Sequence, residues 1–368
     1  MSLVYSWGSD IYGRLGHGTE DKNISSPTQI KSLPANISHV ETGSAHNIAV
    51  DGEGRVYTWG KCHYGQLGHG EMDEDEHSPR IVESLKGIAI SCVVGGDSHV
   101  LAVTRDQGRV YSWGVGYYGT LGHGDESSLA VPKLIEGIPE SVRIIGGGGG
   151  AYHSIVLASD GSVYVWGRNQ YGQLGLPSAS VRLTTQKVPL LNKFEELVQM
   201  LSACFNHTLF LLESGRVLSF GYNEHGELGH PSSSGPLVDP AHFNEKVTHV
   251  KAGWKHCAAI TKSQDLYVWG HGAYGRLGLG HSRDTDTPSQ VRGLAKWIDV
   301  SCGESHTIAL DSTGQLWGWG SNHYGKLGLS MDEGSFIDRP RMLSFASPSG
   351  LTGVATGTNH TLAYSILS

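Results

Sequence analysis

Seven copies of one sequence pattern predict an all-β fold, a seven-bladed β-propeller whose blades are four-stranded antiparallel sheets. Each copy has an aromatic residue followed by glycine and, six residues after the aromatic, a Gly-x-Leu-Gly tetrad. Successive aromatics lie 52, 54, 53, 54, 49 and 50 residues apart, and a fixed period in this range is typical of repeat architectures. The aromatics are Trp7, Trp59, Trp113, Trp166, Phe220, Trp269 and Trp319.

The second copy illustrates how one unit is expected to fold. Residues 47–50 and 55–59 are rich in β-formers, and the glycine-containing segment 51–54 between them predicts a tight hairpin turn. Pro79 is expected to open another short strand, because its missing N–H is tolerated at an edge or a strand start. The apolar stretch 89–94 completes four strands, and a proline recurs about 20 residues after each aromatic.

The two ends of the chain carry complementary fragments of one blade. His360 ends the last Gly-x-x-His motif, and too few residues follow it for another aromatic strand. Residues 3–8 form an aromatic strand without a preceding hairpin partner. We therefore expect this strand to pair with residues 361–366, which closes the ring and removes an exposed sheet edge. Residues 1–368 are then one propeller domain, which we expect to be a monomer.

The composition excludes several classes of function. The net charge is −8 and no basic arm is present, so direct nucleic-acid binding is not expected. Five cysteines without a CxxC spacing indicate reduced thiols, and thus a cytoplasmic or nuclear protein. No apolar run reaches the roughly 18 to 20 residues of a membrane span.

Most motifs that suggest chemistry lie at repeated positions of the pattern. Residues 114–119 and 270–275 both match G-x-G-x-x-G, but they fall between the aromatic and the tetrad, where no βαβ unit is predicted. The glycine run 146–150 lacks the Lys-Ser/Thr of a phosphate-binding loop. We expect no catalytic residue, cofactor or metal site.

Two further regular features are interpreted as structural. Tyrosine precedes six of the seven tetrads, which favours packing between blades, and only His225 departs from this rule. Histidine ends a Gly-x-x-His motif in six units and the corresponding Cys204-Phe205-Asn206-His207 loop in the fourth, and we expect it to bond backbone groups of neighbouring strands. These histidines are His46, His99, His153, His207, His256, His306 and His360.

The two variable positions inside each Gly-x-x-His motif are the candidate functional residues, because function resides in the irregular loops of a regular frame. The ring should gather them on one face, around the axis. Aromatic and charged side chains together there are typical of a protein-binding surface; the alternative is that Trp254 and Tyr152 pack against adjacent loops. The predicted partner-binding residues are Asp97, Ser98, Tyr152, Asn206, Trp254, Lys255, Glu304 and Asn359.

The combined pattern resembles the regulator of chromosome condensation repeat, over essentially the whole chain. The founding member of that family is a nucleotide exchange factor for the GTPase Ran, and it uses acidic and histidine loop residues together with a protruding wedge. The loop 96–99, with Asp97, is similar to its second loop, whereas loops 150–153 and 253–256 lack the residues that the exchange factor uses there. Every aromatic-to-tetrad step here is six residues, which leaves no wedge insertion.

The resemblance implies three functions among which the residues discriminate. The plant UV-B photoreceptor branch repeats Gly-Trp-Arg-His in consecutive blades, whereas Trp254 stands alone here. The copies within HECT-type ubiquitin ligases act as binding modules, and phrases such as residues 78–87 are similar to them. We predict a protein-interaction scaffold; nucleotide exchange on a small GTPase is the alternative and photoreception a remote one. The expected partners are proteins, a small GTPase or a ubiquitin-pathway protein among them.

Overall fold

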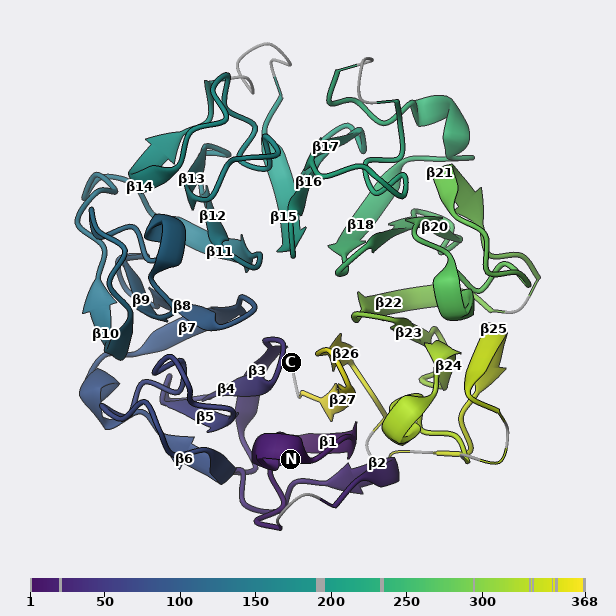
Figure 1. Ribbon diagram of the computed structural model, residues 1–368, viewed down its shortest axis with the longest axis horizontal. Coiled ribbons are helices and arrows are strands. Elements are labelled where there is room, and N and C mark those ends of the chain that lie inside the picture. The colour runs from purple at the N-terminus through teal and green to yellow at the C-terminus, as the bar shows by residue number, and fades with distance from the viewer. Residues whose placement is uncertain are drawn as a thin grey trace.

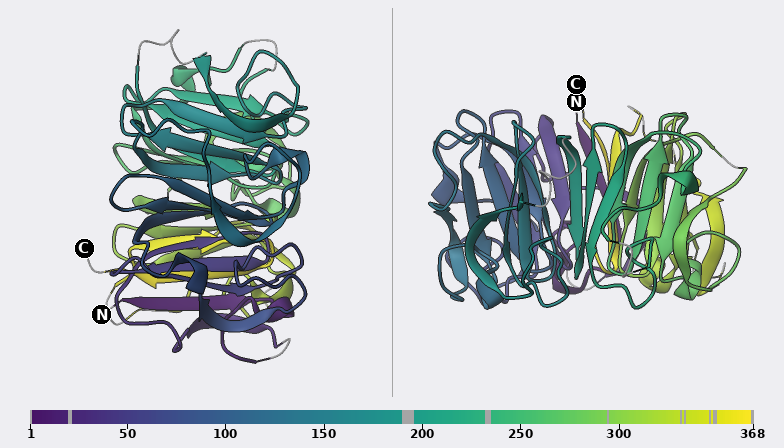
Figure 2. Two further views of the ribbon diagram at one scale, coloured as in Figure 1. Left: turned by 90° about the vertical axis from the view of Figure 1, so that its left-hand side faces the viewer. Right: turned by 90° about the horizontal axis from the view of Figure 1, so that it is seen from above.

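The seven repeats form seven antiparallel sheets arranged as a ring around one axis (Figure 1). The computed structural model describes residues 2–19, 22–189, 196–231, 235–293, 295–330, 332, 334–345, 347 and 350–366. The first strand of each sheet lies beside the axis and the last lies at the rim, and the ring is a thick disc when seen from the side (Figure 2). The predicted fold class is confirmed.

Blades are numbered here from the first one that is continuous in sequence, and their strands are given from the axis outward. Blade 1 contains β3 (Ile37–Thr42), β4 (His46–Asp51), β5 (Val56–Gly60) and β6 (Glu76–Ile81). Blade 2 contains β7 (Ile90–Gly95), β8 (His99–Thr104), β9 (Val110–Gly114) and β10 (Leu129–Leu134). Blade 3 contains β11 (Ile144–Gly149), β12 (His153–Ala158), β13 (Val163–Gly167) and β14 (Arg182–Lys187). Blade 4 contains β15 (Val198–Cys204), β16 (His207–Leu212) and β17 (Val217–Gly221).

The remaining blades follow the same order. Blade 5 contains β18 (Val247–Ala252), β19 (His256–Thr261), β20 (Leu266–Gly270) and β21 (Thr285–Gln290). Blade 6 contains β22 (Trp297–Cys302), β23 (His306–Asp311), β24 (Leu316–Ser321) and β25 (Phe336–Met342). Blade 7 contains β26 (Gly353–Thr356), β27 (His360–Ser365), β1 (Leu3–Gly8) and β2 (Ile24–Gln29).

Short 3-10 turns are the helical elements of the described chain. Four of them lead into tetrads, and two of these end the G-x-G-x-x-G segments, so both segments are loops, as predicted. The turns before tetrads are η1 (Ile11–Gly13), η3 (Tyr117–Gly119), η7 (Ala273–Gly275) and η8 (His323–Gly325). Two others follow or replace fourth strands, namely η2 (Glu83–Leu85) and η6 (Pro240–His242).

Blade 7 closes the ring as the sequence predicts. β1 pairs antiparallel with β27 from Leu3 opposite Ser365 to Gly8 opposite His360. Each of the other blades except blade 4 has four regular strands. In blade 4 the segment 236–238 takes the fourth position and bonds β17 through Ser219 N to Pro236 O and Val238 N to Val217 O.

The position predicted for Pro79 is wrong in one respect. It lies inside β6, the outermost strand of blade 1, and not at a strand start. The register between β5 and β6 shifts between the pairs Thr58–Arg80 and Gly60–Glu76, which bracket the proline. An outer strand with such an irregularity needs no N–H at this point, which explains how proline is accommodated within it.

The hydrophobic core lies between adjacent blades, and the recurring residues of the repeat contribute to these contacts. One cluster, for example, joins Ile48 and Val56 of blade 1 to Val93 and Trp113 of blade 2. The six pattern tryptophans are fully buried, and each donates its indole N–H to a tetrad carbonyl of the preceding blade. The pairs are Trp59–Arg14, Trp113–Gln66, Trp166–Thr120, Trp269–Glu227, Trp319–Arg276 and Trp7–Lys326, at 2.7 to 3.2 Å.

The last glycine of each tetrad explains why the tetrad and the aromatic recur together. A Cβ on Gly68 would lie 2.9 Å from Nε1 of Trp113, and one on Gly328 would lie 3.1 Å from Nε1 of Trp7 across the closure. The tetrad of one blade therefore lies directly against the tryptophan of the next. Phe220 is the exception that has no N–H to donate, and Gly175 packs against its ring carbons.

Candidate functional site

Two kinds of loop share one face of the disc, which we call the loop face. The Gly-x-x-His loop joins the first and second strands of a blade, and the tetrad loop joins the third and fourth. In blade 2, His99 at the start of β8 pairs with Gly114 at the end of β9, so the two loops leave the sheet on the same side. The hairpins that join the second and third strands of each blade, and the connections between blades, therefore lie on the opposite face.

The seven histidines of the Gly-x-x-His loops are fully buried beneath the loop face. Six of them bond through Nε2 to one position of the next blade, the residue that follows its own histidine. This partner is a serine, threonine, cysteine or asparagine. The pairs are His99–Ser154, His153–Thr208, His207–Cys257, His256–Thr307, His306–Thr361 and His360–Asn47, at 2.6 to 3.1 Å.

These bonds correct the expectation that the histidines bond backbone groups, because the direct partner is a side chain. The partner in turn reaches backbone: Ser154 Oγ donates to the carbonyl of Thr120, and Thr361 Oγ1 donates to that of Lys326. A carbonyl can only accept, so the hydroxyl proton is committed and the histidine donates through Nε2–H. Burial lowers the pKa of His99 and His153 to about 3, which keeps both rings neutral.

His46 is the exception in this ring. The position that should receive its bond is Val100, a fully buried apolar residue. Both ring nitrogens of His46 are buried without a hydrogen-bond partner among the described residues. Burial lowers the pKa of His46 to about 3 as well.

The glycine of the Gly-x-x-His motif leaves room for the imidazole. A Cβ on Gly96 or Gly150 would lie 2.0 Å from Cε1 of the histidine three residues on. Neighbouring loops also approach closely near the axis, since a Cβ on Gly95 would meet the carbonyl of Thr42 at 2.4 Å. Glycine therefore provides space at these positions. Blade 4 carries Cys204 at the corresponding position, and there Phe205 adopts a positive φ of 42°.

Backbone hydrogen bonds link the Gly-x-x-His loops to one another around the axis. The amide of Ser44 donates to Asp97 O, the amide of Asp97 to Gly150 O, and the amide of Thr358 to Ser44 O across the closure. In the same way, the amide of Ala151 donates to Phe205 O and the amide of Trp254 donates to Gly303 O. The loops are therefore held in fixed relative positions without a ligand.

The predicted partner-binding residues lie on this face, and most of them are partly exposed. Trp254 stacks on Phe205 of the preceding blade with centroids 4.9 Å apart, and Tyr152 contacts Tyr118 edge-on at 5.2 Å. Both aromatics therefore pack against neighbouring loops, as the alternative interpretation proposed, and both keep part of their surface exposed. Asn206 is 8% exposed and contributes little surface.

One polar member of the set, Asn359, bonds a buried lysine. Nζ of Lys326, which is 2% exposed, bonds Oδ1 of Asn359 and Oγ of Ser305, both at 2.8 Å. Burial lowers the pKa of Lys326 to about 8. The carbonyl of Glu304 accepts from Arg276 at 2.6 Å. Ser98 and Lys255 flank buried histidines and are partly exposed.

Asp97 is the acidic residue of the blade 2 Gly-x-x-His loop and lies beside the axis. Its Oδ1 is buried without a hydrogen-bond partner among the described residues, and burial raises the pKa of its carboxyl group to about 6. The ammonium group of Lys61 opposes this shift. The side chain of Ser44 opposes the shift more strongly than Lys61 does, so the carboxyl group is held within the loops.

The tyrosines before the tetrads were missed as surface residues. Tyr118, Tyr171, Tyr274 and Tyr324 are 38, 38, 51 and 40% exposed. Tyr118 also contacts the next blade, because Arg168 lies over its ring at 5.1 Å, and Tyr171 contacts Tyr222 of the next blade at 5.0 Å. Their regularity signals a loop conformation with outward-facing rings, and packing between blades is only part of their role.

The second tetrad position is another signal that sequence reasoning passed over. In three consecutive blades it carries a cation, namely Arg276, Lys326 and Arg14, and each is 4% exposed or less. They bond neutral oxygen acceptors, such as Ile11 O for Arg14 and Ala273 O for Arg276. In the described residues, Arg276, Lys326 and Arg14 thus form an arc of buried positive charge beneath the loop face of blades 5 to 7.

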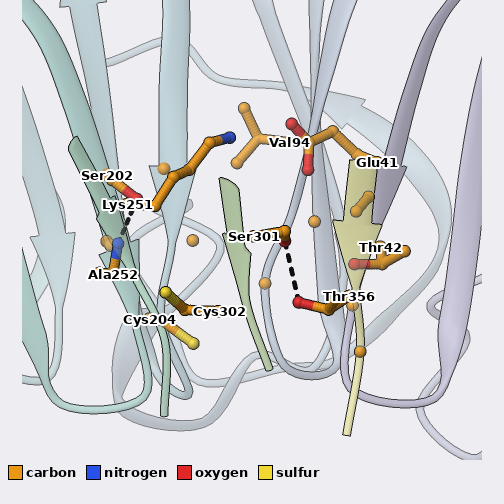
Figure 3. A pocket seen from close by; sticks show the side chains of 18 of the residues that line it. Glu41, Thr42, Val94, Ser202, Cys204, Lys251, Ala252, Ser301, Cys302 and Thr356 are labelled. Atoms are coloured by element: carbon orange, nitrogen blue, oxygen red, sulfur yellow. Dashed lines mark hydrogen bonds between the residues drawn. The ribbon is translucent and has the colours of Figure 1, made fainter. Parts of the chain in front are cut away.

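A cavity of about 140 Å³ follows the axis, lined by the first strands and the Gly-x-x-His loops (Figure 3). Lys251 and Glu41 point toward one another across it (Figure 3). Burial opposes the charge on Lys251, but Glu41 and Asp299 outweigh it and raise the pKa of Lys251. The cavity is smaller than the roughly 300 Å³ of ordinary small-molecule sites, so the loop face is the better candidate site.

Family models identify the repeat. The model of the RCC1-like domain matches residues 148–366, and that of the Regulator of chromosome condensation (RCC1) repeat matches residues 3–50, 53–103 and 107–157. A second RCC1 repeat model matches residues 37–66 and 88–120.

Curated relatives are similar over most of this chain. The Ultraviolet-B receptor UVR8 of Arabidopsis thaliana is 36% identical over 308 residues, which are 82% of this chain and 68% of the receptor. The human E3 ubiquitin-protein ligase HERC2 is 32% identical over 302 residues, which are 79% of this chain but 6% of the ligase. Human HERC6, a probable E3 ubiquitin-protein ligase by name, is 33% identical over 311 residues, 81% of this chain and 29% of that protein.

Solved structures share the fold at lower identity. Human WBSCR16 superimposes with a TM-score of 0.86 at 22% identity, covering 100% of this chain and 99% of that one. Prp20p of Saccharomyces cerevisiae gives 0.85 at 21% identity, covering 100% and 92%. With family models over both halves and these relatives, the chain belongs to the family of RCC1-repeat propellers.

Proposed function

We propose that this chain is a protein-interaction propeller that binds its partner through the loop face. The observation that carries the proposal is the ring of outward-facing tyrosines around partly exposed Trp254 and Tyr152. Tyrosine and tryptophan are enriched where proteins bind one another, because they offer large contact areas with a polar group.

The rigidity of the loop face supports the same role. Backbone bonds join the Gly-x-x-His loops, and aromatic contacts such as Tyr64–Tyr117 and Tyr171–Tyr222 join tetrad loops of adjacent blades. A surface that is already ordered loses little conformational entropy on binding. The positive arc under blades 5 to 7 and the carboxylate of Asp97 would orient the partner.

The relatives suggest which kinds of partner to test. The matched parts of HERC2 and HERC6 belong to proteins named as ubiquitin ligases, which favours a ubiquitin-pathway protein. A nuclear or cytoplasmic location accompanies this proposal. Within the described residues, no helix has the length and apolar character needed to cross a bilayer.

Nucleotide exchange on a small GTPase is the second candidate, and Asp97 is the observation that favours it. The structure of Prp20p is described together with its binding to Gsp1p and histones, and Asp97 occupies the loop whose acid resembles that of the family's exchange factor. Against it, every described strand belongs to one of the seven blades, so the described loop face carries no protruding hairpin. The similarity to the Ultraviolet-B receptor is the one observation for photoreception. Against it, the loops on either side of Trp254 carry Phe205 and Glu304 in place of tryptophan.

The first experiment measures release of labelled GDP from a panel of small GTPases, Ran included, with and without the protein. Acceleration that Asp97→Asn abolishes would establish exchange and overturn the scaffold proposal. We expect no acceleration on any member of the panel.

The second experiment compares the proteins that associate with the wild type and with three variants. Trp254→Ala and Asp97→Asn should each weaken partner binding at least tenfold, because the first removes a stacked aromatic and the second the charge of the carboxylate. Glu140→Gln is the matched control, since Glu140 is 86% exposed in a connection on the opposite face. Equal binding by all variants would move the interface away from the loop face.

A further inference from the structure

A cluster of two histidines and one aspartate lies on the loop face where blades 4 and 5 meet. The potential ligand atoms of His225, His271 and Asp284 all lie within 4.8 Å of one another. Nδ1 of His225 is 2.9 Å from Oδ2 of Asp284, and Nε2 of His271 is 3.9 Å from Oδ1. The two imidazole rings stack with centroids 3.9 Å apart.

The repeat architecture brings these residues together although they are far apart in sequence. His225 precedes the tetrad of blade 4, while His271 and Asp284 belong to the tetrad loop of blade 5. A Cβ on Gly226 would lie 2.5 Å from Cα of Asp286, so the blade 4 loop rests directly on the start of β21. The amide of Gly272 donates to Oδ1 of Asp284 at 2.9 Å and fixes the carboxylate.

We propose that His225, His271 and Asp284 bind one divalent transition-metal ion, with Zn²⁺ as the best fit. Imidazole and carboxylate are common Zn²⁺ ligands, at about 2.0 to 2.2 Å from the metal, which places tetrahedral ligand atoms about 3.3 Å apart. The two ligand-atom distances given above lie on either side of this value, and the stacked imidazole rings would rotate so that both nitrogens face one ion. The side chains of the histidines are 21% exposed and that of Asp284 is 45% exposed, which leaves the fourth position open to water or to a partner's side chain.

The departure from the repeat pattern supports a specific role for His225. Six other blades carry tyrosine at its position. The junction of blades 7 and 1 has nearly the same arrangement, with Tyr12 beside His63 at 5.9 Å and Nδ1 of His63 4.0 Å from Oδ1 of Asp75. That junction offers a histidine and an aspartate but a phenol as the third group, so it is a natural comparison.

Charges of both signs lie around the cluster. Arg276 and Lys255 lie near His271 and are opposed there by Asp284, while Glu227 lies near His225 and Lys255. Oε2 of Glu227 accepts from the amide of His225 at 2.8 Å and holds this part of the loop. Within the described residues, neither ring nitrogen of His271 makes a hydrogen bond; its Nδ1 is buried without a partner, and its Nε2 would bind the ion.

The test titrates the whole chain, purified without a polyhistidine tag, with Zn²⁺ by calorimetry and with Co²⁺ by visible absorption. We expect one tight equivalent, and at least tenfold weaker binding in His225→Tyr, which recreates the residue of the other blades. His271→Ser and Asp284→Asn should weaken binding similarly, with circular dichroism confirming that each variant remains folded. The control His63→Gln should bind as the wild type does.

The outcomes are distinct from those that test the partner-binding face. Absence of a stoichiometric site, or equal binding by His225→Tyr and the wild type, would overturn the metal proposal. Weak binding of several ions that no single variant changes would indicate scattered surface histidines and would overturn it too. An anomalous diffraction peak between His225 and Asp284 in a Zn²⁺-soaked crystal would establish the site.

Discussion

Nε2 of His360 donates to Oδ1 of Asn47, 2.6 Å away and 313 positions earlier in the chain. The same relation between a histidine and the residue after the next histidine recurs around the ring and links blade to blade. These histidine bonds accompany the tryptophan-to-carbonyl bonds between the same blades. The side-chain amide of Asn47 donates to the carbonyl of Arg14 at 2.7 Å, and Trp59 donates to the same carbonyl.

The break in this ring at His46 can be repaired by one substitution. Val100→Thr would place a hydroxyl where it can accept from Nε2 of His46 and donate to the carbonyl of Gln66, which Trp113 already bonds at 2.9 Å. We expect the free energy of unfolding to rise by about 0.5 to 1.5 kcal/mol. Urea denaturation at pH 7.5 measures it.

The converse change provides the comparison. Thr361→Val removes the acceptor of His306 and the donor to Lys326 O, and should cost about 1 to 3 kcal/mol. In a His46→Gln background the gain from Val100→Thr should shrink. A stabilising effect that survives unchanged in that background would show that the new hydroxyl does not act through His46.

The buried histidines should make the protein sensitive to acid. In the unfolded chain their pKa is near 6.5, whereas burial lowers the folded value of His46, His99 and His153 to about 3 and that of His207 to about 4. The unfolded state therefore binds more protons below pH 6.5. Stability is complete above pH 6.5 and falls as the pH decreases toward 3, by about 1.4 kcal/mol per unit for each histidine.

These four histidines together account for roughly 5 kcal/mol per pH unit, a large share of the 5 to 15 kcal/mol that ordinary domains have. Urea midpoints between pH 7.5 and 5 should fall steeply, with several protons taken up on unfolding. The slope should decrease by about one proton in His153→Gln. Uptake of fewer than two protons by the wild type between pH 6 and 5 would contradict neutral buried rings.

Most of the features that could be predicted from the sequence depend on residues that recur at the same position in every repeat. Ring closure could be predicted, because the strand that contains Trp7 lacks a preceding hairpin partner and the motif that ends at His360 lacks a following aromatic strand. The histidine partners could not be predicted, since the position after each histidine varies from Asn47 to Val100 to Ser154. Regularity was also misleading for Tyr274, which recurs in the pattern but is 51% exposed and has a φ of 60°.

The proposed metal cluster shows where sequence reasoning ended. His225 and His271 are separated by nearly one repeat, and only the contact between adjacent blades makes them neighbours. The one available signal was that His225 replaces the tyrosine of the other units. His271 occupies a different position of its repeat, two residues after Trp269, and that position varies between units, so the pattern alone did not connect the two histidines.

The glycine run 146–150 contains a matched pair of substitutions for testing how the loops pack. Gly150→Ala would place Cβ 2.0 Å from Cε1 of His153, displace the ring and break its bond to Thr208. We expect a loss of about 3 kcal/mol or more, because a buried polar contact and the packing around it fail together. Gly146→Ala has no atom within 4 Å of its new Cβ.

At Gly146 the backbone is extended in β11, so alanine should be neutral or should stabilise by up to about 1 kcal/mol through the unfolded chain. The two proteins differ only in which end of one glycine run carries the methyl group. Thermal and urea unfolding of both, beside the wild type, measure the difference. If Gly150→Ala is as stable as Gly146→Ala, the imidazole of His153 has room to move, and the glycine of the Gly-x-x-His motif is not explained by contact with its histidine.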